Sequence, residues 1–278
     1  GVIGVVAESA DELELASEKA LQCVELRADL LLDNGLSEAD LFALVKAGKQ
    51  AGLGVLFTLR HPTHGGTFQG SEADRVSISL EAVSAGADLF DLEWGSEAAA
   101  SVQQDAPPMI LSHHDFNCMP TAAELHELTE QMERTAARAI KVVPTASRLE
   151  DALTMLKWAG QSNGNISRIG FAMGEAGACS RILTTAMGGE ITYASFGAPV
   201  APGQIDINQL IAQYRIAELN RDTLITAVCI EGDVGQRKVS ELNRSYAGSN
   251  RVAVAFAPAD QSVLEQCTDW MPVSEILT

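Results

Sequence analysis

The chain has 278 residues, of which 46% are hydrophobic and 20% are charged, and its formal net charge of −18 gives an isoelectric point near 4.6. This composition suits one large folded domain, or one domain with an appendage. The acidic balance argues against a nucleic-acid partner, and no apolar run of membrane length or basic leader is present, so we expect a soluble protein without a membrane partner.

The cysteines indicate a reducing compartment. The five cysteines are scattered along the chain and form no C-x-x-C pair. An odd, scattered set is typical of free thiols in an intracellular protein and not of a disulfide framework. We therefore expect a cytoplasmic location.

Apolar runs of strand type alternate with amphipathic helical segments through most of the chain. The predicted strands include 1–8, 23–31, 55–60, 89–94, 166–173 and 191–196, together with the runs that carry His113-His114-Asp115 and Lys141. The predicted helices are 11–21, 37–51, 72–86, 96–104, 121–137, 147–160, 177–187 and 205–217. About eight strand-helix repeats within residues 1–218 favour an α/β protein with a (β/α)8 TIM barrel. The active site of such a barrel lies at the C-terminal ends of its strands.

Residues 219–278 have a different pattern and form a predicted second unit. Strands are predicted at 224–230 and 252–257, and short helices at 240–246 and 261–267. This stretch is too short to build a large core of its own. We expect an accessory strand-helix extension that packs on the barrel or on a partner.

Lys141 is the most informative residue for chemistry. It is one of six lysines, and it alone lies in an apolar strand, flanked by Ile140 and Val142. Burial can lower the pKa of a lysine by several units, which frees the amine as a nucleophile toward a carbonyl. The competing interpretation is a lysine at a strand end whose head reaches solvent or a carboxylate.

His114 ends the preceding predicted strand, so the strand-helix-strand unit places it near Lys141. Asp115 follows directly, and a histidine oriented by a carboxylate is a common general acid or base. Charged residues also alternate within two other predicted strands, which requires that they be paired or line a site. These residues are Glu25, Arg27 and Asp29 in the first strand, and Asp91 and Glu93 in the second.

Taken together, the motifs resemble the type I 3-dehydroquinate dehydratases of the shikimate pathway. The matching segments are E-L-R-A-D at 25–29, T-L-R…G-G at 58–66, D-L-E at 91–93, S-H-H-D-F at 112–116, K-V-V at 141–143, M-G…S-R at 173–181 and A-P-G-Q at 201–204. No single segment is specific, but the set falls in family order and spacing across residues 1–218.

This resemblance implies a hydro-lyase that uses no metal or organic cofactor and forms a homodimer. Lys141 would condense with the C3 ketone of 3-dehydroquinate, and His114 would remove a C2 proton and return a proton to the leaving C1 hydroxyl. The product would be 3-dehydroshikimate. The resemblance also implies that the anionic substrate is bound by Glu25, Arg27, Arg60, Arg181 and Gln204.

Two positions depart from the family pattern. His64 stands where the family carries a glutamate that supports the catalytic histidine, and a histidine cannot supply a fixed negative charge near neutral pH. Val200 stands where bacterial relatives tend to have a serine that touches substrate. Residues 230–243 are also loosely similar to the opening of shikimate dehydrogenases, but no G-x-G-x-x-G follows, so we expect no dehydrogenase activity.

Three alternatives stay open at this stage. The chain could be a weakened or inactive paralogue that binds a shikimate-type acid, or another barrel lyase that forms a lysine imine, such as an aldolase. A metal site could also form from the four histidines of the two loops, His61, His64, His113 and His114. Adjacent histidines on a strand point to opposite faces, which argues against the metal site.

Overall fold

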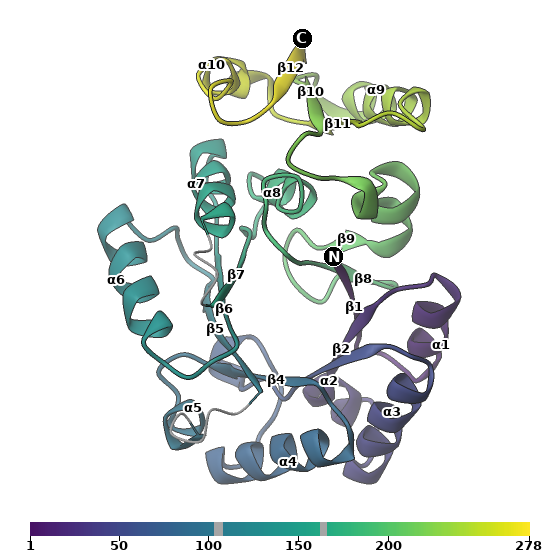
Figure 1. Ribbon diagram of the computed structural model, residues 1–278, viewed down its shortest axis with the longest axis vertical. Helices are drawn as coiled ribbons and strands as arrows, with labels where there is room; N and C mark the ends of the chain where they lie inside the picture. Colours follow the sequence, from purple (N-terminus) through teal and green to yellow (C-terminus); the bar gives the residue numbers. More distant parts are fainter. Residues whose placement is uncertain (103–107, 162–165) are drawn as a thin grey trace.

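A computed structural model describes residues 1–102, 108–161 and 166–278. Most of the chain forms one curled sheet of parallel strands with helices along its outer side (Figure 1). Its strands are β1 Val2–Val6, β2 Cys23–Arg27, β3 Gly54–Thr58, β4 Leu89–Glu93, β5 Met109–Asp115, β6 Ala139–Pro144, β7 Ser167–Gly170, β8 Thr192–Ser195 and the short β9 Ile205–Asp206. The helices between them are α1 Asp11–Glu18, α2 Ala28–Asp33, α3 Glu38–Gln50, α4 Glu72–Ala85, α5 Glu97–Val102, α6 Ala122–Glu133, α7 Leu149–Gly160 and α8 Ala178–Leu183.

The strand order is that of a (β/α)8 barrel, which confirms the predicted fold class. The order β7-β6-β5-β4-β3-β2-β1-β8-β9 places each strand beside its neighbour in sequence, with β8 returning to pair with β1. Within the described residues, no ladder joins β7 to β8, so hydrogen bonding leaves the barrel open on that side. The sheet curls far enough to bring the C-terminal ends of its strands around one cavity.

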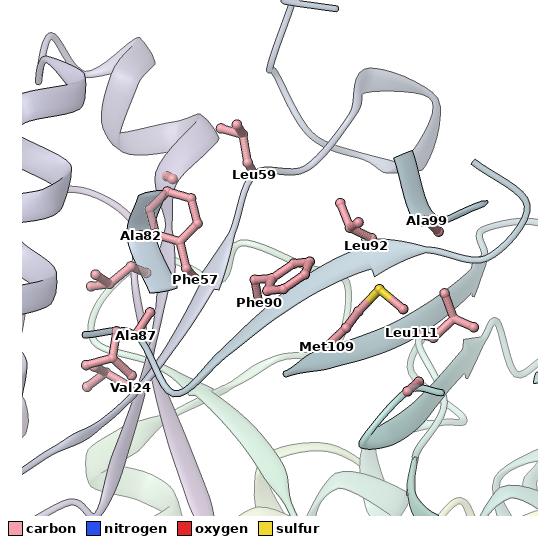
Figure 2. Close-up of a cluster of buried hydrophobic side chains, with 14 of the residues drawn as sticks. Val24, Phe57, Leu59, Ala82, Ala87, Phe90, Leu92, Ala99, Met109 and Leu111 are labelled. Atoms are coloured by element: carbon pink, nitrogen blue, oxygen red, sulfur yellow. The ribbon is translucent and has the colours of Figure 1, made fainter. Parts of the chain in front are cut away.

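The two faces of the sheet have opposite character, because successive side chains on a strand point to opposite sides. The outward side chains pack against the helices as an apolar core, part of which Figure 2 shows around Phe57, Phe90 and Met109. The inward side chains on the same strands include the buried polar groups Thr58 and Asp91. The outer apolar core therefore stabilises the barrel from outside, and the interior holds a smaller apolar cluster, which includes Leu56 and Ile110, together with charged and polar side chains.

Capping boxes fix where three of the helices begin. The side chains of Ser37, Ser71 and Thr121 each accept a hydrogen bond from the backbone three residues on, and the acidic residue there returns a bond to the cap. Such a pair satisfies two backbone groups that the first turn leaves free. The predicted cap at Ser37 is confirmed.

The structure corrects two predicted elements, and a third lies partly outside the residues that it describes. The strand predicted at 23–31 ends at Arg27, and α2 begins at once, because Ala28 and the leucines that follow Asp29 favour a helix. The helix predicted at 205–217 is instead β9, a π-helix at Gln209–Gln213 and a 3-10 turn at Ile216–Glu218. The end of the helix predicted at 96–104 lies outside the described residues.

The C-terminal stretch forms a small parallel sheet of its own in the order β11-β10-β12. Its elements are β10 Leu224–Val228, α9 Gly232–Ser245, β11 Arg251–Ala255, α10 Gln261–Glu265 and β12 Val273–Leu277. Both predicted strands are present, but the helix predicted at 240–246 begins at Gly232 and the third strand was not predicted. In the described ranges, no helix has both the length and the apolar character needed to span a bilayer.

The C-terminal unit shares its core with two barrel helices. One buried cluster joins Leu153 of α7 and Leu183 of α8 to Val228 and Val254 of the small sheet. Figure 1 shows this unit beyond α7 and α8, on the side where the main sheet ends. The unit thus packs on the barrel, as expected for a sheet too small to bury its faces alone.

We expect Leu183→Ala to lower the free energy of unfolding by about 2–5 kcal/mol, because it opens a cavity in this shared core. Leu183 is fully buried, whereas Leu224 is 42% exposed and its replacement by alanine serves as the control. Urea unfolding followed by circular dichroism measures both variants. Equal effects of the two substitutions would contradict the shared core.

Candidate active site

The site residues predicted from sequence lie around one cavity with about 590 Å³ of empty space, part of it open to solvent. They come from the C-terminal ends of the strands and from the loops that follow. All eight line this cavity: Glu25, Arg27, Arg60, His64, His114, Lys141, Arg181 and Gln204.

Lys141 is buried at the centre of this site, with 5% of its surface exposed. Its Nζ atom lies 3.8 Å from Oδ2 of Asp91 and 4.1 Å from the centre of the Tyr193 ring. Burial lowers the pKa of Lys141, and the carboxylates of Glu25 and Asp91 oppose that shift. The geometry also meets the competing expectation of a lysine head beside a carboxylate, and the lowered pKa favours the neutral amine needed for attack on a carbonyl.

A network of buried charges surrounds the lysine. Nη1 of Arg60 lies 2.9 Å from Oδ1 of Asp91 and 3.3 Å from Oε1 of Glu93, and it donates to Oγ of Ser112 at 2.8 Å. Ser112 in turn donates to Oδ1 of Asp91 at 2.6 Å. Burial alone would lower the pKa of Arg60, but the carboxylates outweigh it and raise that pKa. The sequence-based expectation that Asp91 and Glu93 point inward and are paired is confirmed.

The strand register explains this arrangement. Glu93 on β4 is the partner of Ser112 on β5, and Ser112 is the partner of Lys141 on β6, so one row across three strands holds all three. Behind the row, Arg75 on α4 is fully buried and pairs with Glu93 and with Glu72. Arg75 therefore holds the Glu93 carboxylate from the helix layer outside the sheet. Sequence reasoning missed this contact.

His114 lies at the end of β5 with its ring stacked on Phe116, the ring centroids 6.2 Å apart. Its Nδ1 atom is buried and makes no hydrogen bond within the described residues. Burial and the positive charges of Arg60 and Lys141 hold the pKa of His114 well below its usual value. The imidazole is therefore neutral at neutral pH and can accept a proton.

The predicted pairing of His114 with Asp115 is wrong. Asp115 accepts hydrogen bonds from the backbone of Asn117 and Cys118 at 2.8 and 3.1 Å, which closes the turn after β5. Its charge acts instead on His113, the residue on the opposite face of the strand. Sequence adjacency failed here because neighbours on a strand point apart.

His64 stands at the mouth of the cavity in a loop held to the barrel. The backbone of Gly66 approaches Arg60 so closely that a Cβ atom there would lie 2.1 Å from the Arg60 carbonyl oxygen, and Thr67 bonds to Asp29 of α2. Burial lowers the pKa of His64. Thus His64 and His114 face the same cavity as two weakly basic imidazoles.

The remaining predicted residues form the opposite wall. Arg27 is tied to Asp29 by two bonds of 2.9 and 2.7 Å, and Glu25 accepts a bond from Thr58 at 2.8 Å. Arg181 makes no ion pair in the described part of the chain; it donates to the carbonyl of Pro202 at 3.1 Å. Burial lowers the pKa of Arg181 to about 10. Arg181 is therefore the buried cation whose charge is available to an anionic ligand.

The loop that carries Gln204 is closed by its own side chain. Oε1 of Gln204 accepts a hydrogen bond from the backbone N–H of Val200 at 2.8 Å, and both residues line the cavity. The amide nitrogen of Gln204 remains available to a ligand. Among residues the structure describes, no three His, Cys, Asp or Glu side chains gather in a group that could hold a metal ion, so the four-histidine alternative has no geometric support.

The chain matches a known protein family over most of its length. A family model described as type I 3-dehydroquinase matches residues 2–221. The chain belongs to the type I 3-dehydroquinase family. The resemblance drawn from the motifs is confirmed.

Two curated relatives differ in how much of their length this dehydroquinase covers. A 3-dehydroquinate dehydratase from Dehalococcoides mccartyi is 35% identical over 196 residues, which cover 69% of this chain and 84% of the relative. A bifunctional 3-dehydroquinate dehydratase/shikimate dehydrogenase from Arabidopsis thaliana is 31% identical over 235 residues, which cover 81% of this chain but 38% of the relative. This chain therefore spans less than half of that bifunctional protein.

Solved structures show the same fold. A 3-dehydroquinate dehydratase from Geobacillus kaustophilus has a TM-score of 0.68 at 26% identity and covers 78% of this chain and 90% of its own. The dehydroquinate dehydratase and shikimate dehydrogenase from S. pombe has a TM-score of 0.63 at 22% identity and covers 95% of this chain and 54% of its own. The second match takes in most of the chain, including part of the C-terminal unit.

We expect Asp91→Asn to lower the pKa of Lys141 further, because it removes one of the two carboxylates that raise this pKa while keeping a side chain that can accept from Ser112. The pH dependence of Lys141 acetylation, mapped by mass spectrometry, measures this shift. Asp88→Asn is the matched control, since Asp88 pairs with Lys49 at 2.7 Å on the surface. A reactivity midpoint that stays in place or moves to higher pH would contradict the argument.

We expect His64→Glu to raise the pKa of His114, because a carboxylate then faces an imidazole that is otherwise surrounded by cationic groups such as Arg60 and Lys141. Nuclear magnetic resonance of labelled histidine measures the titration directly. The acid limb of the pH–rate profile should move to higher pH with it, since the base must be neutral. His126→Gln, at an exposed site on α6, is the control and should change neither the His114 titration nor the acid limb. An unmoved His114 titration in His64→Glu would contradict an electrostatic interaction between residues 64 and 114.

Proposed function

We propose that this dehydroquinase eliminates water from 3-dehydroquinate to give 3-dehydroshikimate through an imine on Lys141, within the shikimate pathway. The single observation that carries the proposal is the buried lysine amine beside Asp91, in one cavity with a neutral histidine and an unpaired arginine. Relatives that share the family are 3-dehydroquinate dehydratases by name. An iminium is a better electron sink than a ketone, which makes the adjacent C–H acidic enough for an imidazole base.

Each step uses a group already in place. The neutral Nζ of Lys141 attacks the C3 ketone, and loss of water leaves an iminium. His114 takes a proton from C2, and the resulting enamine expels the C1 hydroxyl, to which the imidazolium returns a proton. Water then hydrolyses the imine and frees the product. The depressed pKa values of Lys141 and His114 supply the two unprotonated groups that these steps need.

The cationic side chains suit an anionic substrate. Arg181 has no carboxylate partner in the described ranges, so the substrate carboxylate would supply one. Arg27 and Arg60 are already paired, so we assign them, with Glu25 and Gln204, to the substrate hydroxyls. Such charge-assisted bonds also fix the ring so that C2 faces His114.

Residues 1–218 would be the catalytic barrel and residues 219–278 an accessory unit that buttresses it. The core shared with α7 and α8 supports that division of roles. The plant relative's dehydrogenase activity is not proposed for this chain, in which no nucleotide-binding motif was found. We also propose a cytoplasmic homodimer: the five free cysteines support a reducing compartment, and the dimer is an expectation from the family resemblance.

Borohydride trapping tests the imine. Wild-type protein incubated with 3-dehydroquinate and borohydride should gain a substrate-sized adduct on Lys141, and Lys141→Ala should gain none and lose the dehydratase rate by a factor of at least about a thousand. His114→Ala should still be trapped but should turn over far more slowly, because imine formation does not need the C2 proton to be removed. Lys157→Ala, which removes a lysine outside the cavity, is the control.

The outcomes separate the competing functions. An adduct with no turnover in the wild-type protein would favour an inactive paralogue that binds a shikimate-type acid. An adduct with pyruvate or an aldehyde but not with 3-dehydroquinate would favour another imine-forming lyase. If folded protein forms no adduct and shows no turnover, the proposal is overturned.

A further inference from the structure

Tyr193 lies against the reactive lysine, and none of the steps above uses it. It comes from β8, is 3% exposed and lines the cavity. The centre of its ring is 4.1 Å from Nζ of Lys141, and the ring is tilted against Phe171 at 5.8 Å between centroids. A ring face in that position attracts an ammonium or iminium by a cation–π interaction.

The hydroxyl of Tyr193 is buried and makes no hydrogen bond with any residue that the structure describes. The other two of the three tyrosines have partners: Tyr246 pairs with Thr226 at 3.0 Å, and Tyr214 interacts with Gln213. A buried unpartnered hydroxyl is costly, and a phenylalanine would offer the same ring without that cost. Because Tyr193 lines the cavity, its unpartnered hydroxyl points to a bond that is made to a ligand.

The groups around this hydroxyl keep it protonated. Burial, followed by the charges of Glu25 and Asp91, raises the pKa of Tyr193 well above its ordinary value, and Arg60 opposes them only in part. Tyr193 can therefore donate a hydrogen bond during the reaction, but it does not give up its proton.

We propose that Tyr193 positions Lys141 with its ring and donates, through its free hydroxyl, a hydrogen bond to the oxygen of the carbinolamine formed on that lysine. The inference rests on the proposed function. The lone pair of Nζ forms the new C–N bond, the carbonyl π pair moves to oxygen, and that oxygen takes up the proton that nitrogen loses. A second proton, taken from solvent at the open side of the cavity, then lets the oxygen leave as water and leaves the iminium. Tyr193 stabilises the oxygen throughout and is unchanged at the end.

Two substitutions separate the hydroxyl from the ring. Tyr193→Phe removes only the hydroxyl, so imine formation in a single-turnover borohydride experiment should slow about fivefold to tenfold. The unliganded variant should melt at a higher temperature, because an unsatisfied buried group is gone. Tyr193→Leu also removes the ring, and it should move the midpoint of Lys141 acetylation to lower pH, which Tyr193→Phe should not do.

Tyr214→Phe is the matched control, because Tyr214 is also buried but lies outside the cavity lining. It should leave the rate of imine formation unchanged and lower the melting temperature. A Tyr193→Phe variant that forms the imine at the wild-type rate would overturn the role of the hydroxyl, and a Tyr193→Leu variant with an unmoved lysine midpoint would overturn the role of the ring. Failure of wild-type protein to form any adduct would instead strike the proposed function, so the two failures are distinguishable.

Discussion

The structure of this dehydroquinase depends on one constraint, which is that a charge buried inside the barrel is costly unless it is paired. An isolated buried ion costs several kcal/mol, and a well-made pair recovers that cost only with good geometry and extra hydrogen bonds. Arg60, which follows β3, meets the condition by joining Asp91 and Glu93 of β4 and Ser112 of β5. The resulting network fixes β3, β4 and β5 relative to one another. Lys141 lies at its edge, where the charges of Glu25 and Asp91 both act on it, although its Nζ is 3.8 Å from Asp91 and donates no hydrogen bond to it among the described residues.

That pairing decides which groups remain free for chemistry. The protein as a whole carries a formal charge of −18, yet its cavity is lined by Arg27, Arg60, Arg181 and Lys141. Two of the arginines are neutralised by carboxylates, which leaves Arg181 as the cation for an anionic substrate. The local field that an acidic substrate meets is therefore set by a few unpaired groups and not by the net charge. Burial likewise lowers the pKa of Lys141, and Glu25 and Asp91 offset this shift only in part.

The sequence alone predicted the barrel fold and the eight side chains that line the cavity, because strand periodicity and motif order are local signals. It could not reach contacts that depend on the depth of packing. Asp115 is adjacent to His114 in sequence, but the pleat turns it away to close a turn. Arg75 is an ordinary residue of an amphipathic helix until the structure shows it fully buried against Glu93. Tyr193 reads as one residue of a buried strand, and only its missing hydrogen-bond partner distinguishes it from a phenylalanine.

The C-terminal unit acquires a role through the helix it packs on. In α8, Cys179, Ile182 and Leu183 belong to the core shared with the small sheet, while Arg181 on the same helix lines the cavity. A helix of six residues makes few bonds of its own and is held in place by its neighbours. The position of Arg181 is thus supported both by barrel contacts, such as the hydrogen bond to Pro202, and by the core that α8 shares with β10 and β11. In the described residues, no backbone ladder joins β7 to β8, and α8 lies between these two strands in sequence. The small C-terminal sheet therefore supports the barrel where its own strands are not hydrogen-bonded to each other.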